Sequence, residues 1–375
     1  MTITPYSIAV PQQRLARIRQ QLADYQWPAG PADDSGWRYG ADIGFLRRLQ
    51  GHWLGAYDWR AAERDLNRLP QFMAEVDGQR LHFIHARAQR SDGAPALPLL
   101  LTHGWPGSCF EFQQLVAPLT AAGFDVVIPS LPGFLFSPAP ARPIGLRAVS
   151  RLWHRLMSET LGYRRYGVHG GDMGSAVSTW LAHDQPDHVA GLHLNLCTMA
   201  AADAAAPQTD DERAWALALQ QVQQREMAYA ALHATKPQTV ALALADNPLG
   251  SAAWLLEKFH AWSDCGGDLS TVYSFDDLIT AVMLYLVSDS LPSSLWMYRG
   301  AAEENSGQLP AGARIGVPTA IARFPKEFLP HPPRSRIERS FNVIRWSEFQ
   351  RGGHFPALEQ PAALATDLRE FFGAL

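Results

Sequence analysis

Short apolar runs separated by helical segments dominate the chain from residue 99 onwards. The hydrophobic runs occupy 99–101, 125–130, 165–169, 189–197, 318–324 and 342–346. Strands that are apolar at nearly every position are typical of a parallel sheet that helices cover on both faces. The pattern therefore predicts an α/β protein with a mostly parallel central sheet.

The remaining segments follow other patterns. Residues 1–75 carry apolar positions at helical spacing, as at Leu15, Ile18 and Leu22, whereas 72–88 alternate and predict an antiparallel strand pair. Ala-rich helical sequence from 201 to 300 is too long for a loop and predicts a helical lid. A last helix is expected around 363–372. We predict four parts: a helical N-terminal extension (1–75), a first core part (76–200), the lid (201–300) and a second core part (301–375).

Composition narrows the classes of partner and compartment. The chain has 375 residues, 47% of them hydrophobic, and a net charge of −4, so neither nucleic acid nor an anionic membrane is expected as a partner. No segment has the apolar length of a transmembrane helix, and the N-terminus lacks a signal-peptide pattern. Three cysteines without metal-ligand spacing predict no disulfide framework. The expected compartment is the cytoplasm.

The most informative motif lies at 166–178, which reads YGVHGGDMGSAVS. A short strand pattern enters an acid flanked by glycines and a helical pattern leaves it, as in the nucleophile elbow of hydrolases, with Asp172 where Ser usually stands. Any side chain at Gly170 or Gly174 is expected to collide with the neighbouring strand or helix. A carboxylate in this position attacks carbon and forms an alkyl ester. Opening of an epoxide and displacement of a halide fit that chemistry.

A simpler interpretation of the same motif is a helix cap. Gly-Asp before an apolar run is also an ordinary N-cap, and the motif alone gives the two interpretations about equal weight.

An Asp nucleophile needs a base to activate water and an acid to orient that base, in the chain order nucleophile, acid, base. The base is predicted to be His354, in the segment RGGHFPA after the last strand. The predicted acid is Glu327, just after the preceding strand. Glu338, Glu348 and Asp203 are the competing acids.

The developing oxyanion needs two donors. The segment HGWP turns sharply after a predicted strand, and Pro106 has no N–H, so the backbone N–H of Trp105 is the expected donor there. The second donor is expected to be the backbone N–H of Met173, directly after the nucleophile.

Over nearly its whole length the chain resembles the microsomal-type epoxide hydrolases, a branch of the α/β-hydrolase superfamily with a helical N-terminal extension. The matching stretches are YDWR, LNRLPQF, HFIHAR, LLLTHGWPGS, VVIPSLPGF, GGDMGS, TKPQT, WLLEKFHAW, DDLITAVMLY and GGHFPALEQP. The resemblance implies two lid tyrosines that donate hydrogen bonds to the epoxide oxygen, at Tyr229 and Tyr298. Met173, Leu135 and His169 depart from it, where the family often has Trp, Gly and Gln.

The sequence therefore predicts an epoxide hydrolase that forms vicinal diols through an ester on Asp172, hydrolysed by water that His354 activates. We expect no metal or organic cofactor, and a small-molecule epoxide and water as partners, with a homo-oligomer left open. Two alternatives remain: a haloalkane or haloacid dehalogenase with the same Asp nucleophile, and a catalytically silent binding protein of the same fold.

Overall fold

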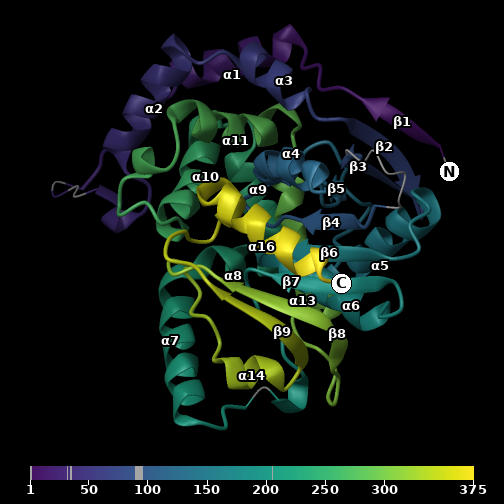
Figure 1. Cartoon of the computed structure of the whole chain (residues 1–375). Helices are drawn as coiled ribbons and strands as arrows, with labels where there is room; N and C mark the ends of the chain where they lie inside the picture. Colours follow the sequence, from purple (N-terminus) through teal and green to yellow (C-terminus); the bar gives the residue numbers. More distant parts are fainter. Residues whose placement is uncertain (1, 32, 34–35, 89–95, 205) are drawn as a thin grey trace.

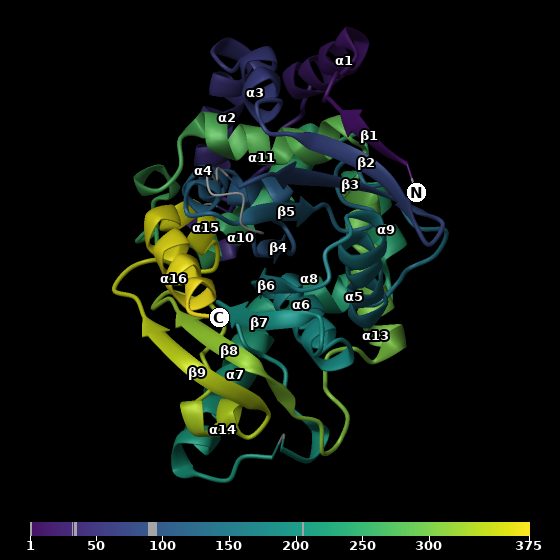
Figure 2. The same ribbon diagram turned by 45° about the vertical axis from the view of Figure 1, so that its right-hand side comes forward.

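The computed structural model describes residues 2–31, 33, 36–88, 96–204 and 206–375 (Figure 1). A central sheet runs through the molecule with helices on both faces. The helices of the N-terminal extension lie outside α11 (Phe275–Val287), at the top of both views (Figures 1 and 2). The α/β architecture with a mostly parallel sheet confirms the predicted fold class.

Nine strands in the described part of the chain form one sheet, in the order β1-β2-β3-β5-β4-β6-β7-β8-β9. The pairs from β1 to β3 and the β3–β5 pair are antiparallel, and the pairs from β5 to β9 are parallel. The strands are β1 (Ile3–Tyr6), β2 (Gln71–Val76), β3 (Gln79–Ala86), β4 (Pro98–Thr102), β5 (Asp125–Pro129), β6 (Tyr166–Gly170), β7 (Val189–Leu194), β8 (Ile315–Arg323) and β9 (Phe341–Glu348).

The central strands are hydrophobic because no face of them meets water. Every residue of β4, β5, β6 and β7 is buried. Among the helices that pack against these four strands are α4 (Gln113–Ala121), α6 (Asp172–Asp184) and α16 (Pro361–Gly373). The other helices of the core are α5 (Leu146–Arg155), α14 (Arg334–Glu338) and α15 (Pro356–Glu359). The predicted strand pair of 72–88 is β2 with β3, and the predicted last helix lies within α16.

One element has no counterpart in the predicted pattern. Strand β1 lies in the stretch assigned to a helical extension and pairs with β2 at the edge of the sheet. Its first three residues are exposed, so no alternation of apolar and polar positions marks it. This strand exists because β2 offers it a free edge, which local sequence does not encode.

The extension supports the lid. Its helices are α1 (Gln12–Ala23), α2 (Ile43–Gly55) and α3 (Trp59–Leu66). The hydroxyl of Tyr57 lies 3.0 Å from Oγ1 of Thr280, and Nε2 of His52 lies 2.7 Å from Oδ1 of Asp276. Both partners are on α11, so the extension holds this lid helix from outside.

The lid helices run from Asp210 to Glu304, compared with the predicted range of 201–300. At the start of the lid, the buried carboxylate of Glu212 accepts hydrogen bonds from Arg339 at 2.6 and 2.9 Å, which fastens it to the core. The helices are α7 (Asp210–Glu226), α8 (Ala228–Thr235), α9 (Pro237–Leu244), α10 (Pro248–Trp262), α11, α12 (Leu291–Ser294) and α13 (Trp296–Glu304).

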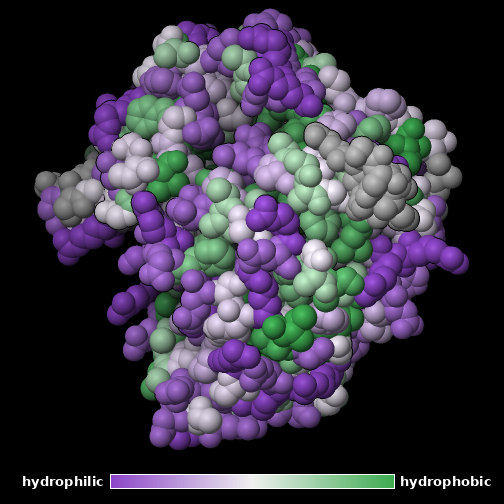
Figure 3. Space-filling view, viewed as in Figure 1, coloured by the Kyte–Doolittle hydropathy of each residue, from purple (hydrophilic) through white to green (hydrophobic). Residues whose placement is uncertain are grey.

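The surface in Figure 3 is mostly polar, with hydrophobic residues in small separate patches. Among the residues that the structure describes, no single helix has the length and composition needed to cross a membrane. The required length and composition are met only by two helices taken together, Phe275–Val287 and Leu291–Glu304, and this pair is bent by 92°.

Candidate active site

Asp172 stands at a tight turn between β6 and α6. Its φ is +48°, in the left-handed region that a non-glycine residue adopts at a cost of about 1–3 kcal/mol. A Cβ at Gly170 would lie 2.2 Å from the carbonyl oxygen of Gly174, and one at Gly174 would lie 1.9 Å from that of Thr102. The turn therefore needs glycine at both positions, as the motif predicts.

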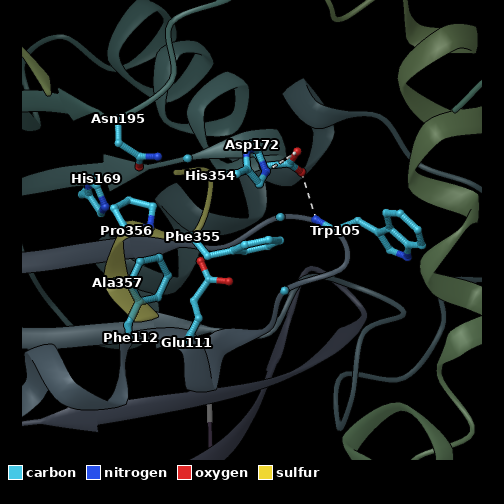
Figure 4. Close-up of a pocket in the computed structure, with 13 residues that line it drawn as sticks. Trp105, Glu111, Phe112, His169, Asp172, Asn195, His354, Phe355, Pro356 and Ala357 are labelled. Carbon is cyan, nitrogen blue, oxygen red and sulfur yellow. Dashed lines mark hydrogen bonds and ion pairs between the residues drawn. The ribbon is translucent and has the colours of Figure 1, made fainter. Parts of the chain in front are cut away.

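The carboxylate of Asp172 does not cap the helix. The N-cap residue of α6 is Gly171, without a side-chain cap bond, and Asp172 is already the first helical residue. Its Oδ1 instead accepts a hydrogen bond of 2.9 Å from the backbone N–H of Trp105 (Figure 4). The strained turn thus presents the carboxylate to other parts of the chain, and the capping alternative is wrong.

His354 and Glu327 meet at Asp172. Nδ1 of His354 lies 2.9 Å from both carboxylate oxygens of Glu327, and its Nε2 lies 3.3 Å from Oδ2 of Asp172. The side chains of His354 and Glu327 are 2% and 1% exposed. The backbone supports this arrangement, because the N–H of Lys326 donates to the carbonyl of Gly352 and ties the loop of the acid to the loop of the base.

The competing acids bind elsewhere. Glu338 pairs with Arg334, Glu348 pairs with Arg323, and Asp203 accepts from the backbone of Gly312. Of the four candidate acids, Glu327 is the one whose carboxylate contacts His354.

Two opposing influences act on the pKa of His354. Burial lowers it, but the carboxylates of Glu327 and Asp172 outweigh burial and raise it to about 10. At neutral pH the ring is therefore an imidazolium held between two carboxylates.

Of the two predicted oxyanion donors, the backbone N–H of Trp105 has an observed partner. The N–H of Trp105 already binds Oδ1 of Asp172. The N–H of Met173 follows directly in the first turn of α6, and its role as second donor stays a prediction.

The two predicted lid tyrosines lie together above Trp105. The hydroxyl of Tyr298 is 3.4 Å from that of Tyr229, whose ring stacks on the indole of Trp105 at 5.1 Å between centroids. Burial and the nearby charge of Asp172 raise the pKa of both phenols, so both carry their protons at neutral pH. The other two lid tyrosines, Tyr273 and Tyr285, are buried and bond to Ser263 and to the carbonyl of Gly107.

A small cavity adjoins the nucleophile. The centre of a water molecule has about 20 Å³ of space in this cavity, which is enough for one water molecule. Glu111 lines the same cavity, and Figure 4 shows its carboxyl next to the ring of Phe355. Its lining residues are Gly104, Trp105, Gly107, Glu111, Phe112, His169, Gly171, Asp172, Asn195, His354, Phe355, Pro356 and Ala357.

Glu111 is a residue that the sequence analysis missed. Burial raises the pKa of its carboxyl to about 8, with His354 opposing and Asp172 reinforcing the shift. A neutral carboxyl in this cavity offers both a donor and an acceptor to a water molecule there. The available signal was a single acid inside the apolar segment Cys-Phe-Glu-Phe (109–112).

Residues with metal-binding chemistry do not cluster in the described part of the chain. No three His, Cys, Asp or Glu side chains there are placed to hold a metal ion. The three cysteines are free and buried.

Two family profiles match overlapping parts of the chain. Residues 3–112 match the profile described as epoxide hydrolase N terminus, and residues 98–265 match that of the alpha/beta hydrolase fold.

Relatives match along the whole length. A protein from Stigmatella aurantiaca, whose name places it provisionally among the epoxide hydrolases, is 39% identical over 100% of this chain and 85% of its own. Epoxide hydrolase 1 of Sus scrofa is 32% identical over 100% of this chain and 89% of its own.

Two solved structures of epoxide hydrolases superpose on this chain over its whole length. The Aspergillus niger epoxide hydrolase superposes with a TM-score of 0.87 at 29% identity, over 100% of this chain and 97% of that one. The juvenile hormone epoxide hydrolase of Bombyx mori gives a TM-score of 0.90 at 27% identity, over 100% and 94%.

Proposed function

The chain belongs to the epoxide hydrolase family, and we propose that it converts small-molecule epoxides to vicinal diols through a covalent ester on Asp172. The observation that carries this mechanism is the position of the Asp172 carboxylate, bound by the Trp105 amide on one oxygen and next to His354 on the other.

The first step is alkylation. Oδ2 of Asp172 attacks an epoxide carbon, the carbon–oxygen bond of the ring breaks, and an alkoxide develops. Tyr229 and Tyr298 donate hydrogen bonds to that oxygen and supply its proton. Because the pKa of each phenol is raised, each proton stays on its phenol until the alkoxide forms.

The second step is hydrolysis. Ester formation removes the charge of Asp172, so His354 loses one of the two carboxylates that hold its pKa at about 10. With that pKa lowered, His354 gives its proton through solvent to the phenolate that alkylation left, and then takes a proton from water while Glu327 orients the ring. The water oxygen attacks Cγ of Asp172, and the amides of Trp105 and Met173 stabilise the oxyanion. The ester C–O bond at Cγ then breaks, and His354 passes the proton to the leaving oxygen, which releases the diol.

The dehalogenase alternative needs halide donors in place of the phenols. Nε1 of the Trp105 indole has no hydrogen-bond partner among the described residues, which makes it a candidate. Its indole, however, extends away from Asp172, whereas its backbone N–H turns toward it (Figure 4). The silent-protein alternative expects a missing nucleophile, acid or base, and this chain has Asp172, Glu327 and His354 in contact.

Turnover tests the proposal. Purified enzyme is incubated with styrene, cyclohexene and terpene oxides, and diol is measured by gas chromatography. Chloroalkanes and haloacids are assayed in parallel for halide release. Diol from at least one epoxide without halide release is the expected result. Halide release without diol would favour the dehalogenase hypothesis over the epoxide hydrolase mechanism.

We also propose the wider setting of this activity. The enzyme removes reactive epoxides from the cytoplasm, works without nucleic acid, membrane or cofactor, and is free to form homo-oligomers. The net charge of −4 supports the expectation that the enzyme does not bind nucleic acid. Cell fractionation tests the location, light scattering tests the oligomeric state, and survival of overexpressing cells in styrene oxide tests detoxification.

A further inference from the structure

The loop that carries the base is bound to the lid through its own backbone. It joins β9, which ends at Glu348, to α15, which begins at Pro356. The backbone N–H of His354 donates to the carbonyl oxygen of Trp262 at 2.9 Å. Trp262 is the last residue of the lid helix α10, so the lid holds the base directly.

A second hydrogen bond joins the same loop to the lid. Oδ2 of Asp264, two residues beyond the end of α10, accepts from the backbone N–H of Gly352 at 2.9 Å. Gly352 has a φ of +106°, which favours glycine. A Cβ at Gly353 would lie 2.5 Å from the carbonyl oxygen of Trp262. The two glycines before the base therefore let the loop approach the lid this closely.

Glu359, the last residue of α15, binds both neighbours of the base. Its Oε1 accepts from the backbone N–H of Phe355 at 2.9 Å, and its Oε2 accepts from that of Gly353 at 2.8 Å. The same Oε2 accepts from the backbone N–H of Asp264 at 2.7 Å. One carboxylate thus holds the residues on either side of His354 and joins them to the lid.

These contacts fit the ionised form of Glu359. Burial raises the pKa of its carboxyl, whereas the three N–H groups and the charge of His354 oppose that rise. A neutral carboxyl would bring a hydrogen of its own to a group of donors, whereas a carboxylate accepts from all three. Hydrogen bonds to an ionised acceptor are also stronger than those to a neutral one.

The position of the His354 ring depends on this set of bonds. All four consecutive backbone N–H groups from 352 to 355 have an acceptor, two of them in the lid segment 262–264 and two on Glu359. They place Nε2 of His354 3.3 Å from Oδ2 of Asp172 (Figure 4). A displacement of about 1 Å at a catalytic group can cost about 10²-fold in rate.

We propose that Glu359 is a positioning residue for the base, and that it holds the loop of His354 to the lid so that Nε2 faces the ester on Asp172. The inference rests on the proposed ester mechanism and concerns its second step. Glu359 acts through the backbone and takes no proton. The lid then serves both steps, because its phenols act in alkylation and its segment 262–264 holds the base for hydrolysis.

Single-turnover kinetics separate the two steps. Enzyme in excess is mixed with styrene oxide and quenched, and mass spectrometry follows the rise and decay of the ester. Glu359→Gln keeps the size of the side chain but sets an amide NH₂ against at least one of the three N–H donors. We expect alkylation within about two-fold of wild type and hydrolysis about ten- to a hundred-fold slower, the effect of a misplaced base.

Two variants of Asp264 test the same loop through a half-buried side chain, and they keep the test open if Glu359→Gln does not fold. Asp264→Ala removes the acceptor for Gly352 and should slow hydrolysis about three- to ten-fold, the effect of one hydrogen bond. Asp264→Asn keeps an oxygen for that N–H and should restore hydrolysis. Alkylation should stay unchanged in both.

A spectroscopic signature reports the position of the base without substrate. The proton on Nδ1 of His354, which is bound to Glu327, is expected to give a low-field ¹H resonance in the resting enzyme. Glu359→Gln should shift or broaden this resonance. The signal does not depend on ester formation, so it tests the positioning role separately from the proposed mechanism.

The matched control is Glu63→Gln. Glu63 is also buried and accepts from a backbone N–H, that of Val10 at 2.8 Å, but it lies in the N-terminal extension. Its loss should lower the melting temperature and leave both steps and the resonance unchanged.

Wild-type hydrolysis in folded Glu359→Gln would overturn the inference. Equal slowing of both steps with an unmoved resonance would do the same, because it indicates a merely structural role. If wild-type enzyme formed diol without an ester on Asp172, the proposed mechanism would fall, and the resonance would still decide whether Glu359 positions His354.

Discussion

Nε2 of His354 lies 3.3 Å from Oδ2 of Asp172, so the predicted base touches the predicted nucleophile before any substrate is bound. In this state the base is protonated, because Asp172 and Glu327 together raise the pKa of His354 to about 10. The contact couples the two steps of the reaction: esterification of Asp172 is the event that releases His354 to act as a base.

Replacing the nucleophile tests the covalent step. Asp172→Asn should abolish turnover and keep the fold, because Asn tolerates the left-handed backbone at this position and still accepts from Trp105. In a single turnover of wild-type enzyme in ¹⁸O water, label should enter the Asp172 carboxylate, as peptide mass spectrometry would show. Label found only in the diol would mean direct attack by water.

Replacing the base should trap the intermediate. His354→Gln is expected to alkylate but not to release product, because water is no longer activated. Intact-protein mass spectrometry should show enzyme plus substrate. A folded, inactive variant without adduct would count against His354. Glu327→Gln should slow the same step less, since the imidazole remains and only its orientation and charge stabilisation are lost.

The lid phenols should matter for alkylation alone. Tyr229→Phe or Tyr298→Phe removes one donor at nearly constant volume, and loss of one such transition-state donor costs about 2.7–4 kcal/mol, or about 10²–10³ in rate. Each variant should slow alkylation by that order, less where the second phenol compensates, and the double variant should be inactive. Stopped-flow tryptophan fluorescence measures the step. Near wild-type alkylation in both single variants would remove the phenols from the mechanism.

The raised pKa of His354 predicts a pH dependence of stability. A group that binds its proton more tightly in the folded state stabilises the fold fully below its unfolded pKa of 6.5. That contribution is lost as the pH rises to about 10. The melting temperature should fall across this window in wild type and fall less steeply in His354→Gln. Parallel curves for the two proteins would show that His354 is neutral in the resting enzyme.

Steric demand at the elbow should appear as lost stability. Gly174→Ala puts a Cβ against the backbone of Thr102, and such overpacking costs about 1–3 kcal/mol or more. Gly316→Ala is the matched control, because nothing lies within 4 Å of a Cβ there. Urea unfolding of both variants gives the comparison. Equal midpoints would show that the turn adjusts to the methyl group.

Sequence reasoning succeeded where the signal is local. The elbow depends on glycines two residues before and after Asp172, and backbone sterics alone dictate both, so the motif was readable without a structure. The buried parallel strands were equally readable, because burial on both faces leaves an uninterrupted apolar run. Chain order then placed Glu327 and His354 after the last two strands.

The tertiary structure decided what depends on contacts between distant segments. It selected Glu327 over the other acids, added β1 at the sheet edge, placed Glu111 in the cavity that Asp172 lines and joined Glu359 to Asp264. No spacing in the sequence marks these contacts, because the strand order and the packing of the lid on the core set them. A residue's type and its immediate neighbours determine the local turn. Its pKa and its protonation state depend instead on burial and on its partners, and both arise only when segments distant in the sequence pack together.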